Sequence, residues 1–425
     1  MAIFETIRNA WMIKDLRRRV VLTMLFLVLF RLGAFIPVPG VDIAEISKIA
    51  SSAGLLGILN LFSGGSLLNF GLLSLGVLPY INASIILNLL QMVIPRLKEM
   101  AKEEGEAGRR KLAQWTRYMS VGLGILESIF FIVYLERSGV PILPDTFLTR
   151  VVITLTLTAG ALITLWIGEV ITEKGIGNGV SLIIFVGIVA RLLPGAIEMV
   201  GLIGSGELPV PELILVLAIS VMIIAAVVTA YTAERKVPVQ YAKRVVGRRM
   251  YGGQSTFIPL RLIQAGVLPI IFAQAVLMLP VTLAGFIPGL QGFAELFYSG
   301  TSWAYNLLLF FLIIFFVYFY TSISFNPTEL ADNLQKYGGF VPGVRPGPGT
   351  ATYFQRILSH ISLPAAVFLG ILAILPNFFM PLLAVSGTGF LFGGTSILIV
   401  IGVALETVRQ IEAFMVMRHY EGFLK

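Results

Sequence analysis

The chain has 425 residues, of which 57% are hydrophobic and 13% are charged, and its formal net charge is +8. Because soluble domains carry about 25% charged residues, this composition excludes an ordinary soluble domain and predicts an integral membrane protein. The sequence contains no cysteine and only two histidines, which excludes disulfides, cysteine nucleophiles and thiolate metal sites. We therefore expect neither a metal nor a cofactor.

The apolar windows, taken in chain order, predict ten membrane-spanning helices. The first window follows three arginines and ends at a Pro-Val-Pro-Gly sequence without a small-residue cleavage pattern, which indicates a retained span rather than a cleaved signal peptide. Several windows contain glycine or proline, which neighbouring helices must compensate. The ten windows are residues 20–36, 75–94, 119–135, 151–170, 180–193, 213–231, 267–286, 304–323, 361–383 and 396–416.

Residues 57–90 are apolar almost throughout but too long for a single crossing, which needs about 20 helical residues. A Ser-Gly-Gly-Ser turn at residues 63–66 interrupts the run. A helix too short to span is tolerated at membrane depth only where it is buried in protein or lines a water-filled cavity. We expect residues 57–68 to fold back into a central cavity, and the following run to make the crossing.

The distribution of Lys and Arg predicts the orientation in the membrane. With the N-terminus in the cytoplasm, 26 of the 31 Lys and Arg residues fall on the cytoplasmic side, four fall on the opposite side, and Arg31 lies inside the first span. This asymmetry places both termini in the cytoplasm. Snorkelling toward the headgroups explains Arg31, and a functional charge is the alternative.

Two segments 215 residues apart resemble each other and suggest an internal duplication. Alignment of Ser181 with Ser396 matches a glycine-containing turn and a following Ile/Leu/Val run at the starts of the fifth and tenth spans. Five spans per half reverse the orientation of the second half, which predicts an inverted repeat with halves at residues 1–193 and 194–425. Chance similarity between two apolar helix starts remains the alternative.

Nine ordered motifs, several of them in loops, carry a resemblance to a known family. They are FRLGAFIPVPG (30–40), NLFSGGSL (60–67), LPYINASIILNLL (78–90), EGEAGRRK (104–111), GEVITEKGIGNGVSLIIF (168–185), YAKRVVGRRMYGGQSTFIPL (241–260), AGVLPIIFA (265–273), FNPTELADNLQKYGGFVPGVRPG (325–347) and FGGTSILIV (392–400). In these motifs the chain resembles the SecY/Sec61-alpha family over essentially its whole length. The resemblance implies an all-α membrane protein, with ten helices in two inverted five-helix halves around an hourglass pore and a re-entrant plug helix.

The implied function is a protein-conducting channel of the inner (cytoplasmic) membrane, which moves unfolded secretory polypeptides across it and releases transmembrane segments sideways. The resemblance assigns a plug and a ring of aliphatic residues at the pore waist, where a narrow apolar constriction expels water and ions. Composition alone reads the ring residues as ordinary core, and the plug as an external loop with an amphipathic helix. The implied ring is Val77, Ile81, Val180, Ile184, Ile271 and Ile399, and the implied plug is Ile58, Leu59, Asn60, Leu61, Phe62, Ser63, Gly64 and Gly65.

Polar residues on the predicted spans are assigned by the resemblance to a lateral gate between spans two and three and spans seven and eight. A signal sequence would replace the contacts there and leave into the bilayer. Interhelical hydrogen bonds without a gating role explain the same residues. The implied gate residues are Asn82, Asn88, Ser128 and Gln274.

Two cytoplasmic loops are rich in positive charge and in turn residues. The resemblance implies that they dock the ribosome, with its RNA and protein surface, and the motor ATPase SecA; the small subunits SecE and SecG, signal sequences, translocating polypeptides and membrane lipids complete the implied partners. A topology determinant or a lipid-headgroup patch explains basic loops equally well. The implied docking residues lie in the loops 233–262 and 325–358: Arg235, Lys236, Lys243, Arg244, Arg248, Arg249 and Arg345.

Enzymatic activity is not expected. The chain has no GxxxxGKS or GxxxxGKT pattern, and helix-end capping explains Glu169 and Glu173 better than an acid/base pair. A secondary transporter of small solutes also uses inverted repeats, but its buried acidic candidates here, Glu127 and Glu406, have no obvious partner in the sequence. An intramembrane hydrolase would need a Ser/His, paired Asp or metal constellation, and neither histidine lies in the middle of a span.

Overall fold

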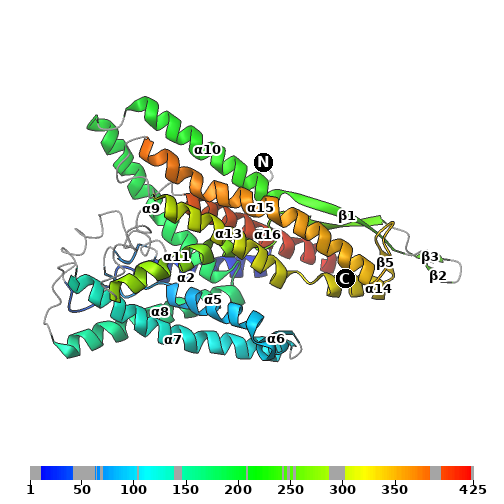
Figure 1. Cartoon of the computed structure of the whole chain (residues 1–425), viewed down its shortest axis with the longest axis horizontal. Helices are drawn as coiled ribbons and strands as arrows, with labels where there is room; N and C mark the ends of the chain where they lie inside the picture. Colours follow the sequence, from blue (N-terminus) through cyan, green and yellow to red (C-terminus); the bar gives the residue numbers. More distant parts are fainter. Residues whose placement is uncertain are drawn as a thin grey trace.

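The structure is a computed structural model dominated by long helices, with a small sheet at one end (Figure 1). It describes residues 11–41, 63, 65–67, 70–102, 105–137, 146–206, 209–241, 244–246, 249–251, 255–286, 302–382 and 394–422. The described helices are α2 (Lys14–Gly33), α5 (Leu78–Val93), α6 (Pro95–Lys102), α7 (Gly105–Arg137), α8 (Phe147–Lys174), α9 (Gly179–Gly204), α10 (Val210–Thr232), α11 (Leu268–Phe286), α13 (Trp303–Ser324), α14 (Pro327–Lys336), α15 (Pro348–Leu382) and α16 (Gly394–Gly422).

Each of the ten predicted windows falls on one of these helices. Within the described residues, α7, α8, α9, α10, α13 and α15 are by themselves long and apolar enough to cross a membrane, and α5 and α11 contain shorter apolar helices. The helices α2 and α16 carry several charged residues at one end. The helices α7 and α15 begin well before their predicted spans, because a hydropathy window detects only the part of a helix that lies at membrane depth.

A small antiparallel sheet lies at one end of the helices, where the sequence predicts only loops. Strand β1 (Glu234–Tyr241) pairs with β4 (Ser255–Arg261) and with β5 (Gly339–Phe340), in the order β4-β1-β5. A second pair, β2 (Arg244–Val246) with β3 (Arg249–Tyr251), lies between β1 and β4 in the chain. The fold is therefore helical as predicted, with the correction that the first basic loop folds into strands and the second contributes the short strand β5, α14 and the start of α15.

The sheet has a hydrophobic core of its own because alternate residues of β1 point inward. Val237 and Val239 are buried while their neighbours are exposed, which is the period of two expected of a strand with one covered face. They pack against the other members of one cluster: Leu260, Leu334, Val341 and Phe354. We call β1, β4 and β5, together with α14 and the start of α15, the strand platform.

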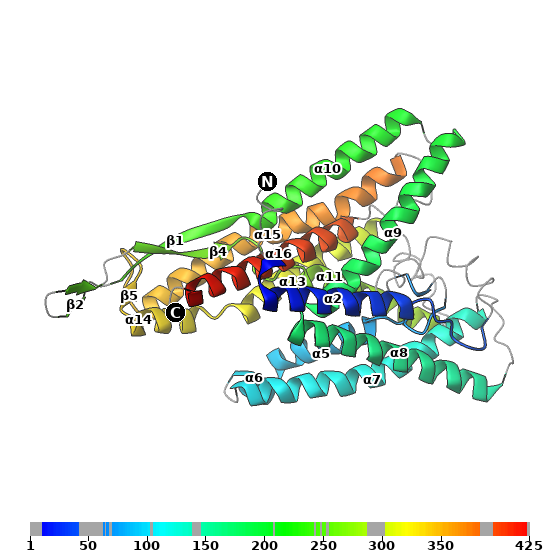
Figure 2. The ribbon, with the colours of Figure 1, turned by 180° about the vertical axis from the view of Figure 1, so that it is seen from behind.

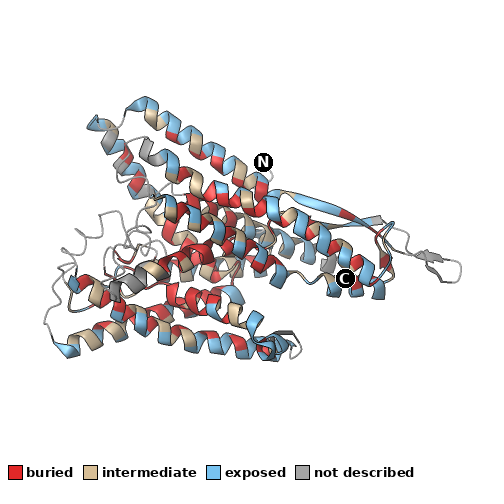
Figure 3. Cartoon of the chain, viewed as in Figure 1, coloured by how far each residue is buried: buried red, intermediate tan, exposed pale blue. Residues whose placement is uncertain are grey.

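Buried residues concentrate where the helices meet in the middle of the molecule (Figure 3). The largest cluster takes side chains from α2, α5, α7, α8, α9, α10, α11, α13, α15 and α16. The outer faces instead expose large apolar residues, such as Val221 on α10 and Phe311 on α13. This distribution suits a bilayer, since lipid tails do not penalise exposed apolar side chains.

The helices form two groups that face each other. Figures 1 and 2 show α5, α7 and α8 on one side and α10, α13, α15 and α16 on the other, with α2 and α11 between them. The boundary predicted between residues 193 and 194 lies inside α9, which continues through Pro194 to Gly204. The inverted relation between the two halves stays a prediction.

Candidate functional site

The six predicted ring residues come together from four helices. They lie at the start of α5 and on α9, α11 and α16, and all belong to or pack against the largest hydrophobic cluster. Val180 is half-buried, and the other five are at most 2% exposed. Their common location fits a constriction between the two groups of helices, and their role as a pore ring stays a prediction.

Close packing of α9 against α8 at the start of α9 fixes the positions of Val180 and Ile184. The Asn178 side chain caps the helix by accepting the Ser181 backbone N–H at 3.1 Å. A Cβ on Gly179 would lie 1.9 Å from the Gly168 carbonyl oxygen on α8, so only glycine allows this approach.

A glycine at the start of α16 allows a similar close approach to a neighbouring helix, which fixes the position of Ile399. A Cβ on Gly394 would lie 2.2 Å from the carbonyl oxygen of Ala373 on α15. Gly394 precedes Ser396 by two residues, as Gly179 precedes Ser181. The partner helices α8 and α15 contain the fourth and ninth predicted spans, which an inverted repeat would make equivalent. This second coincidence supports the predicted duplication.

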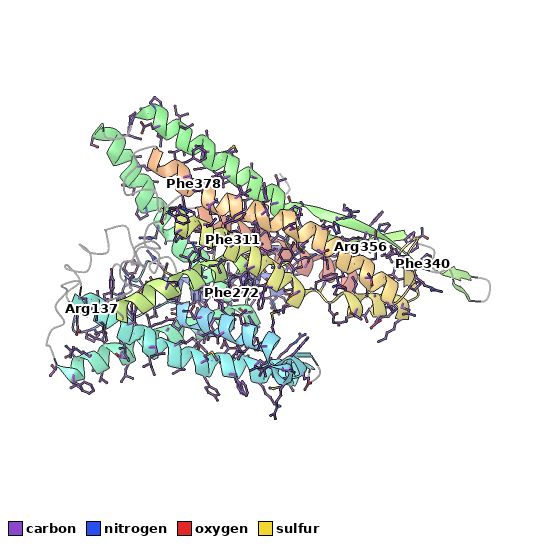
Figure 4. The ribbon with its side chains drawn as sticks, viewed as in Figure 1. Arg137, Phe272, Phe311, Phe340, Arg356 and Phe378 are labelled. Carbon is purple, nitrogen blue, oxygen red and sulfur yellow. The ribbon has the colours of Figure 1, made fainter. Side chains whose placement is uncertain are left out.

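A cavity of about 360 Å³ adjoins the ring residues, and we call it the central cavity. Its apolar wall contains Ile81, Val180 and Ile271 of the predicted ring, together with Leu268 and Phe272. Figure 4 shows Phe272 on α11, between the two groups of helices. The remaining lining residues are polar or charged: Tyr80, Ser84, Arg117, Glu169, Thr172, Glu173, Asn178 and Tyr320.

Only the last part of the predicted plug falls within the described residues. Ser63 is buried, and its hydroxyl oxygen accepts the Leu67 backbone N–H at 3.3 Å. Gly65 has a φ of +84°, a left-handed conformation that glycine adopts without strain, and lies beside the Arg31 guanidinium. Residues 58–62 and Gly64 lie outside the described residues.

The chain that follows the predicted plug is tied to the end of α2. The Ser66 hydroxyl donates to the Ala34 carbonyl at 3.3 Å. The Leu72 N–H donates to the Ile36 carbonyl at 2.6 Å, and the Val38 N–H donates to the Phe70 carbonyl at 2.9 Å. These bonds therefore hold the chain that directly follows the predicted plug against the end of the first span.

One of the four predicted gate residues bonds directly across the two groups of helices. The Asn88 amide on α5 donates to the Tyr320 hydroxyl on α13 at 3.4 Å, and it also reaches Ser84. Both Ser84 and Tyr320 line the central cavity, so this bond lies at its edge. The Tyr320 partner was not predicted, because no sequence signal relates residues 232 positions apart.

The other three predicted gate residues do not bond across the two groups: Asn82 and Ser128 bond within one group, and Gln274 joins α11, which lies between the groups, to α16. Asn82 donates to Glu127 Oε1 on α7 at 2.7 Å, Ser128 and Thr158 hydroxyls lie 3.2 Å apart, and Gln274 donates to the Thr395 hydroxyl on α16. These bonds match the alternative that interhelical packing explains polar residues in spans.

The two acidic residues for which the sequence offers no obvious partner both have neighbours in the structure. Asn82 is the partner of Glu127. Glu406 on α16 interacts electrostatically with Arg261 and Arg409. The expectation that these carboxylates stand alone is therefore wrong, since each interacts with other residues of the protein, although Glu127 Oε2 accepts no hydrogen bond from the described residues.

The predicted docking residues that the structure describes lie on or next to the strand platform, or on the β2–β3 pair. Arg235 and Lys236 are exposed on β1, and Lys236 Nζ lies 3.5 Å from Glu234 Oε1. Arg345 is exposed between β5 and α15, and its carbonyl accepts the Thr350 hydroxyl at 3.0 Å. The remaining docking residues are Arg244 on β2, Arg249 on β3, and Lys243 and Arg248, which lie outside the described residues.

Strand pairing joins the two docking loops into one unit. Gln240 of the first loop pairs with Phe340 of the second, and Tyr241 pairs with Gly339. Figure 4 shows Phe340 at the strand end of the molecule and Arg137 at the opposite end. In the part of the chain that the structure describes, no group of three or more His, Cys, Asp or Glu residues is arranged to hold a metal.

Comparison with known proteins gives consistent matches over nearly the whole chain. The family model of SecY matches residues 71–408. The protein translocase subunit SecY of Streptomyces galbus is 42% identical to this chain, and the match covers 98% of this chain and 99% of that protein. A solved structure described as that of a protein conducting channel superimposes with a TM-score of 0.70 at 18% identity, covering 93% of this chain and 92% of its own. Sec61 in the canine ribosome-channel complex from the endoplasmic reticulum gives a TM-score of 0.63 at 17% identity, with the same two coverages.

Proposed function

The chain belongs to the SecY family of protein translocase subunits, and from this premise we propose how it moves polypeptides through the membrane. It spans the membrane and is a channel for polypeptides rather than an enzyme. Unfolded secretory chains pass along the axis between the two groups of helices, and apolar segments leave sideways into the bilayer. Family membership removes the secondary transporter and the intramembrane hydrolase from consideration.

The membrane is the inner (cytoplasmic) membrane, with both termini in the cytoplasm. The charge asymmetry supports this orientation, because 26 of the 31 Lys and Arg residues fall on the side of the predicted spans that carries the N-terminus. The strand platform, with Arg235, Lys236 and Arg345, would then project into the cytoplasm.

The observation that carries the proposal is the shared location of the ring residues beside a cavity. Ile81, Val180 and Ile271 line the central cavity, which is also lined by the charged residues Arg117, Glu169 and Glu173. The central cavity admits a hydrated polypeptide from the cytoplasm. The path then narrows at the aliphatic ring, which is dry. Branched aliphatic side chains expel water and ions there while making no lasting bond with a passing peptide.

The plug closes the waist from the opposite side in the idle channel. At its described end, Gly65 lies next to Arg31 near the outer end of the first span, which is where a stopper would have to rest. The backbone bonds between residues 36–38 and 70–72 give the plug a fixed tether.

The lateral gate opens where α5 and α7 meet α11 and α13. The Asn88–Tyr320 bond is a contact that a signal sequence would displace. The bonds of Asn82, Ser128 and Gln274 keep each wall of the gate intact while the two walls separate.

The strand platform is the docking site for the ribosome and for SecA, and SecE and SecG are the small subunits of the complex. The fold likeness to Sec61 in a ribosome-channel complex supports the ribosome as a partner. The exposed arginines and lysines on the platform are of the kind that bind RNA phosphates.

Replacement of Ile81, Ile184, Ile271 and Ile399 by glycine tests the ring. We expect the ion conductance of the idle channel in a planar bilayer to rise about tenfold, because glycine removes the apolar surface that excludes water. The matched control replaces four exposed isoleucines on spanning helices: Ile129, Ile163, Ile214 and Ile224. An unchanged conductance, or an equal rise in the control, would show that these residues do not form the constriction.

A further inference from the structure

The turn between α8 and α9 is held by side chains from two neighbouring helices. The Ile176 N–H donates to the Thr23 hydroxyl of α2 at 3.0 Å. The Gly177 N–H donates to the side-chain carbonyl oxygen of Gln410 on α16. Because the turn lies between two helix ends, its backbone N–H groups need acceptors from outside, and these side chains supply them. The bond to Gln410 joins the turn to the other group of helices.

This turn leads directly into two residues of the predicted ring. Val180 and Ile184 lie in the first two turns of α9, and Ile399 lies on α16, the helix that carries Gln410. A helix is stiff over a length of two turns, so a shift of the turn relative to α16 would move Val180 and Ile184 relative to Ile399. The Gly177–Gln410 bond therefore helps to set the width of the ring.

The residue before Gln410 holds the base of the strand platform. Arg409 Nη2 on α16 donates to the carbonyl oxygen of Tyr231, which lies in the last turn of α10. Strand β1 begins at Glu234, whose carboxylate also interacts electrostatically with Arg409. The last carbonyls of a helix have no partner in the helix and carry partial negative charge, so a guanidinium is well placed there.

Further contacts fasten both long strands of the platform to α16. Tyr231 is buried, its hydroxyl donates to the Gly266 carbonyl at 3.3 Å, and a Cβ on Gly402 of α16 would lie 2.9 Å from its oxygen. Glu406 on α16 interacts electrostatically with Arg261, the last residue of β4. A displacement of the base of the platform would therefore displace α16 as well.

We propose that Arg409 and Gln410 are positioning residues that transmit the docking of a partner on the strand platform to the ring. Arg409 links the base of β1 to α16, and Gln410 links α16 to the turn that precedes Val180 and Ile184. Consecutive residues of a helix point about 100° apart, so these two side chains reach different neighbours from the same place on α16. The inference rests on the proposed function and names the route by which an occupied platform loosens the constriction.

Translocation of a secretory protein into vesicles tests the inference, with the chain, its partner subunits and the motor ATPase present. Two quantities are measured: the affinity of the motor for the vesicles, and the translocation rate at saturating motor. We expect Arg409→Gln and Gln410→Ala to leave the affinity within about twofold and to lower the saturated rate about fivefold, because each removes one link between platform and ring.

A conservative variant and two controls separate transmission from general damage. Gln410→Glu keeps an oxygen that accepts the Gly177 N–H, and it should retain at least about half of the wild-type rate. Arg110→Gln and Gln114→Ala make matched changes at exposed positions on α7, and they should change neither quantity.

The double variant tests whether the two side chains act in series. If they do, Arg409→Gln combined with Gln410→Ala should lose about the same fivefold as each single variant, whereas independent defects would multiply to about 25-fold.

The possible outcomes distinguish the inference from the proposed function. A weaker motor affinity with an unchanged saturated rate would assign the two residues to the docking surface and overturn the inference. A multiplicative double variant would also overturn it, as would a Gln410→Glu variant that is as slow as Gln410→Ala. Loss of folded Gln410→Ala protein would count against it too, because the Gln410 side chain would then be needed for folding. A wild-type complex that translocates nothing under these conditions would instead overturn the proposed function.

Discussion

Replacement of Asn82 by alanine should weaken the contact between α5 and α7, because it leaves the Glu127 carboxylate without its hydrogen bond. The Asn82 amide donates to Glu127 Oε1 at 2.7 Å, and Asn82 is only 8% exposed. The other carboxylate oxygen, Oε2, is buried and accepts no hydrogen bond from the described residues. Asn82 is therefore the main polar group that offsets the burial of this side chain.

The size of the effect follows from the kind of bond. A hydrogen bond to a charged group contributes about 1.5–3 kcal/mol in soluble proteins, whereas interhelical bonds in membrane proteins average about 0.6 kcal/mol and reach about 1.7 kcal/mol. Since the alanine variant also leaves a buried acceptor unpaired, we expect a loss of about 2 kcal/mol in the free energy of unfolding. Glu127→Ala removes the unpaired group together with the bond and should cost less.

A double-mutant cycle in mixed micelles measures the coupling directly. Unfolding by increasing SDS is followed through tryptophan fluorescence for wild type, Asn82→Ala, Glu127→Ala and the double variant. The expected coupling energy is about 1–2 kcal/mol. Asn333→Ala, at an exposed position on α14, is the control and should leave the unfolding midpoint in place. If the two single effects simply add, or if Asn82→Ala is as stable as the control, the pair does not hold α5 against α7.

Two other variants test the packing of the ring and the docking surface. Gly179→Ala should abolish the yield of folded protein in detergent, because the new Cβ would lie 1.9 Å from the Gly168 carbonyl oxygen; Gly201→Ala on the same helix meets nothing within 4 Å and should fold normally. Equal yields would contradict the close approach of α8 and α9. Arg345→Glu should leave folding intact, because this exposed side chain lies outside every hydrophobic cluster, but it should abolish motor-driven export in vesicles, and normal export would remove Arg345 from the docking site.

The bilayer makes the helices of this chain predictable from sequence. A spanning segment must satisfy all its backbone hydrogen bonds internally, so an apolar run of sufficient length becomes a helix whatever its neighbours do. The first turns of α7 and α15 were not predicted, because helical turns outside the membrane are polar and carry no hydropathy signal.

The strands of the platform were missed for a different reason. Val237 and Val239 supply the two inward positions of β1, with Pro238 between them and charged or polar residues on either side, so the alternating signal is short. Its pairing with Phe340 and Gly339 joins segments about a hundred residues apart. No local pattern specifies such a pairing.

The candidate site was accessible to sequence only in part. The ring was assigned through the resemblance to a family, and the matching places of Ile184 and Ile399 after Ser181 and Ser396 add weight to that assignment. The partners of Asn82 and Asn88 depend instead on how helices rotate and cross, which side-chain packing decides.

The strand platform has a mechanical consequence. Strand β1 leaves α10 almost at once and extends for eight residues, or roughly 26 Å, away from the helices. A force applied near its far end acts through this arm as a torque on α10 and, through β4, on the segment leading into α11. Strand β5 attaches the second loop to β1, so the force is also transmitted to α13 and α15. A push from a bound motor would therefore rotate this half of the protein as one rigid body.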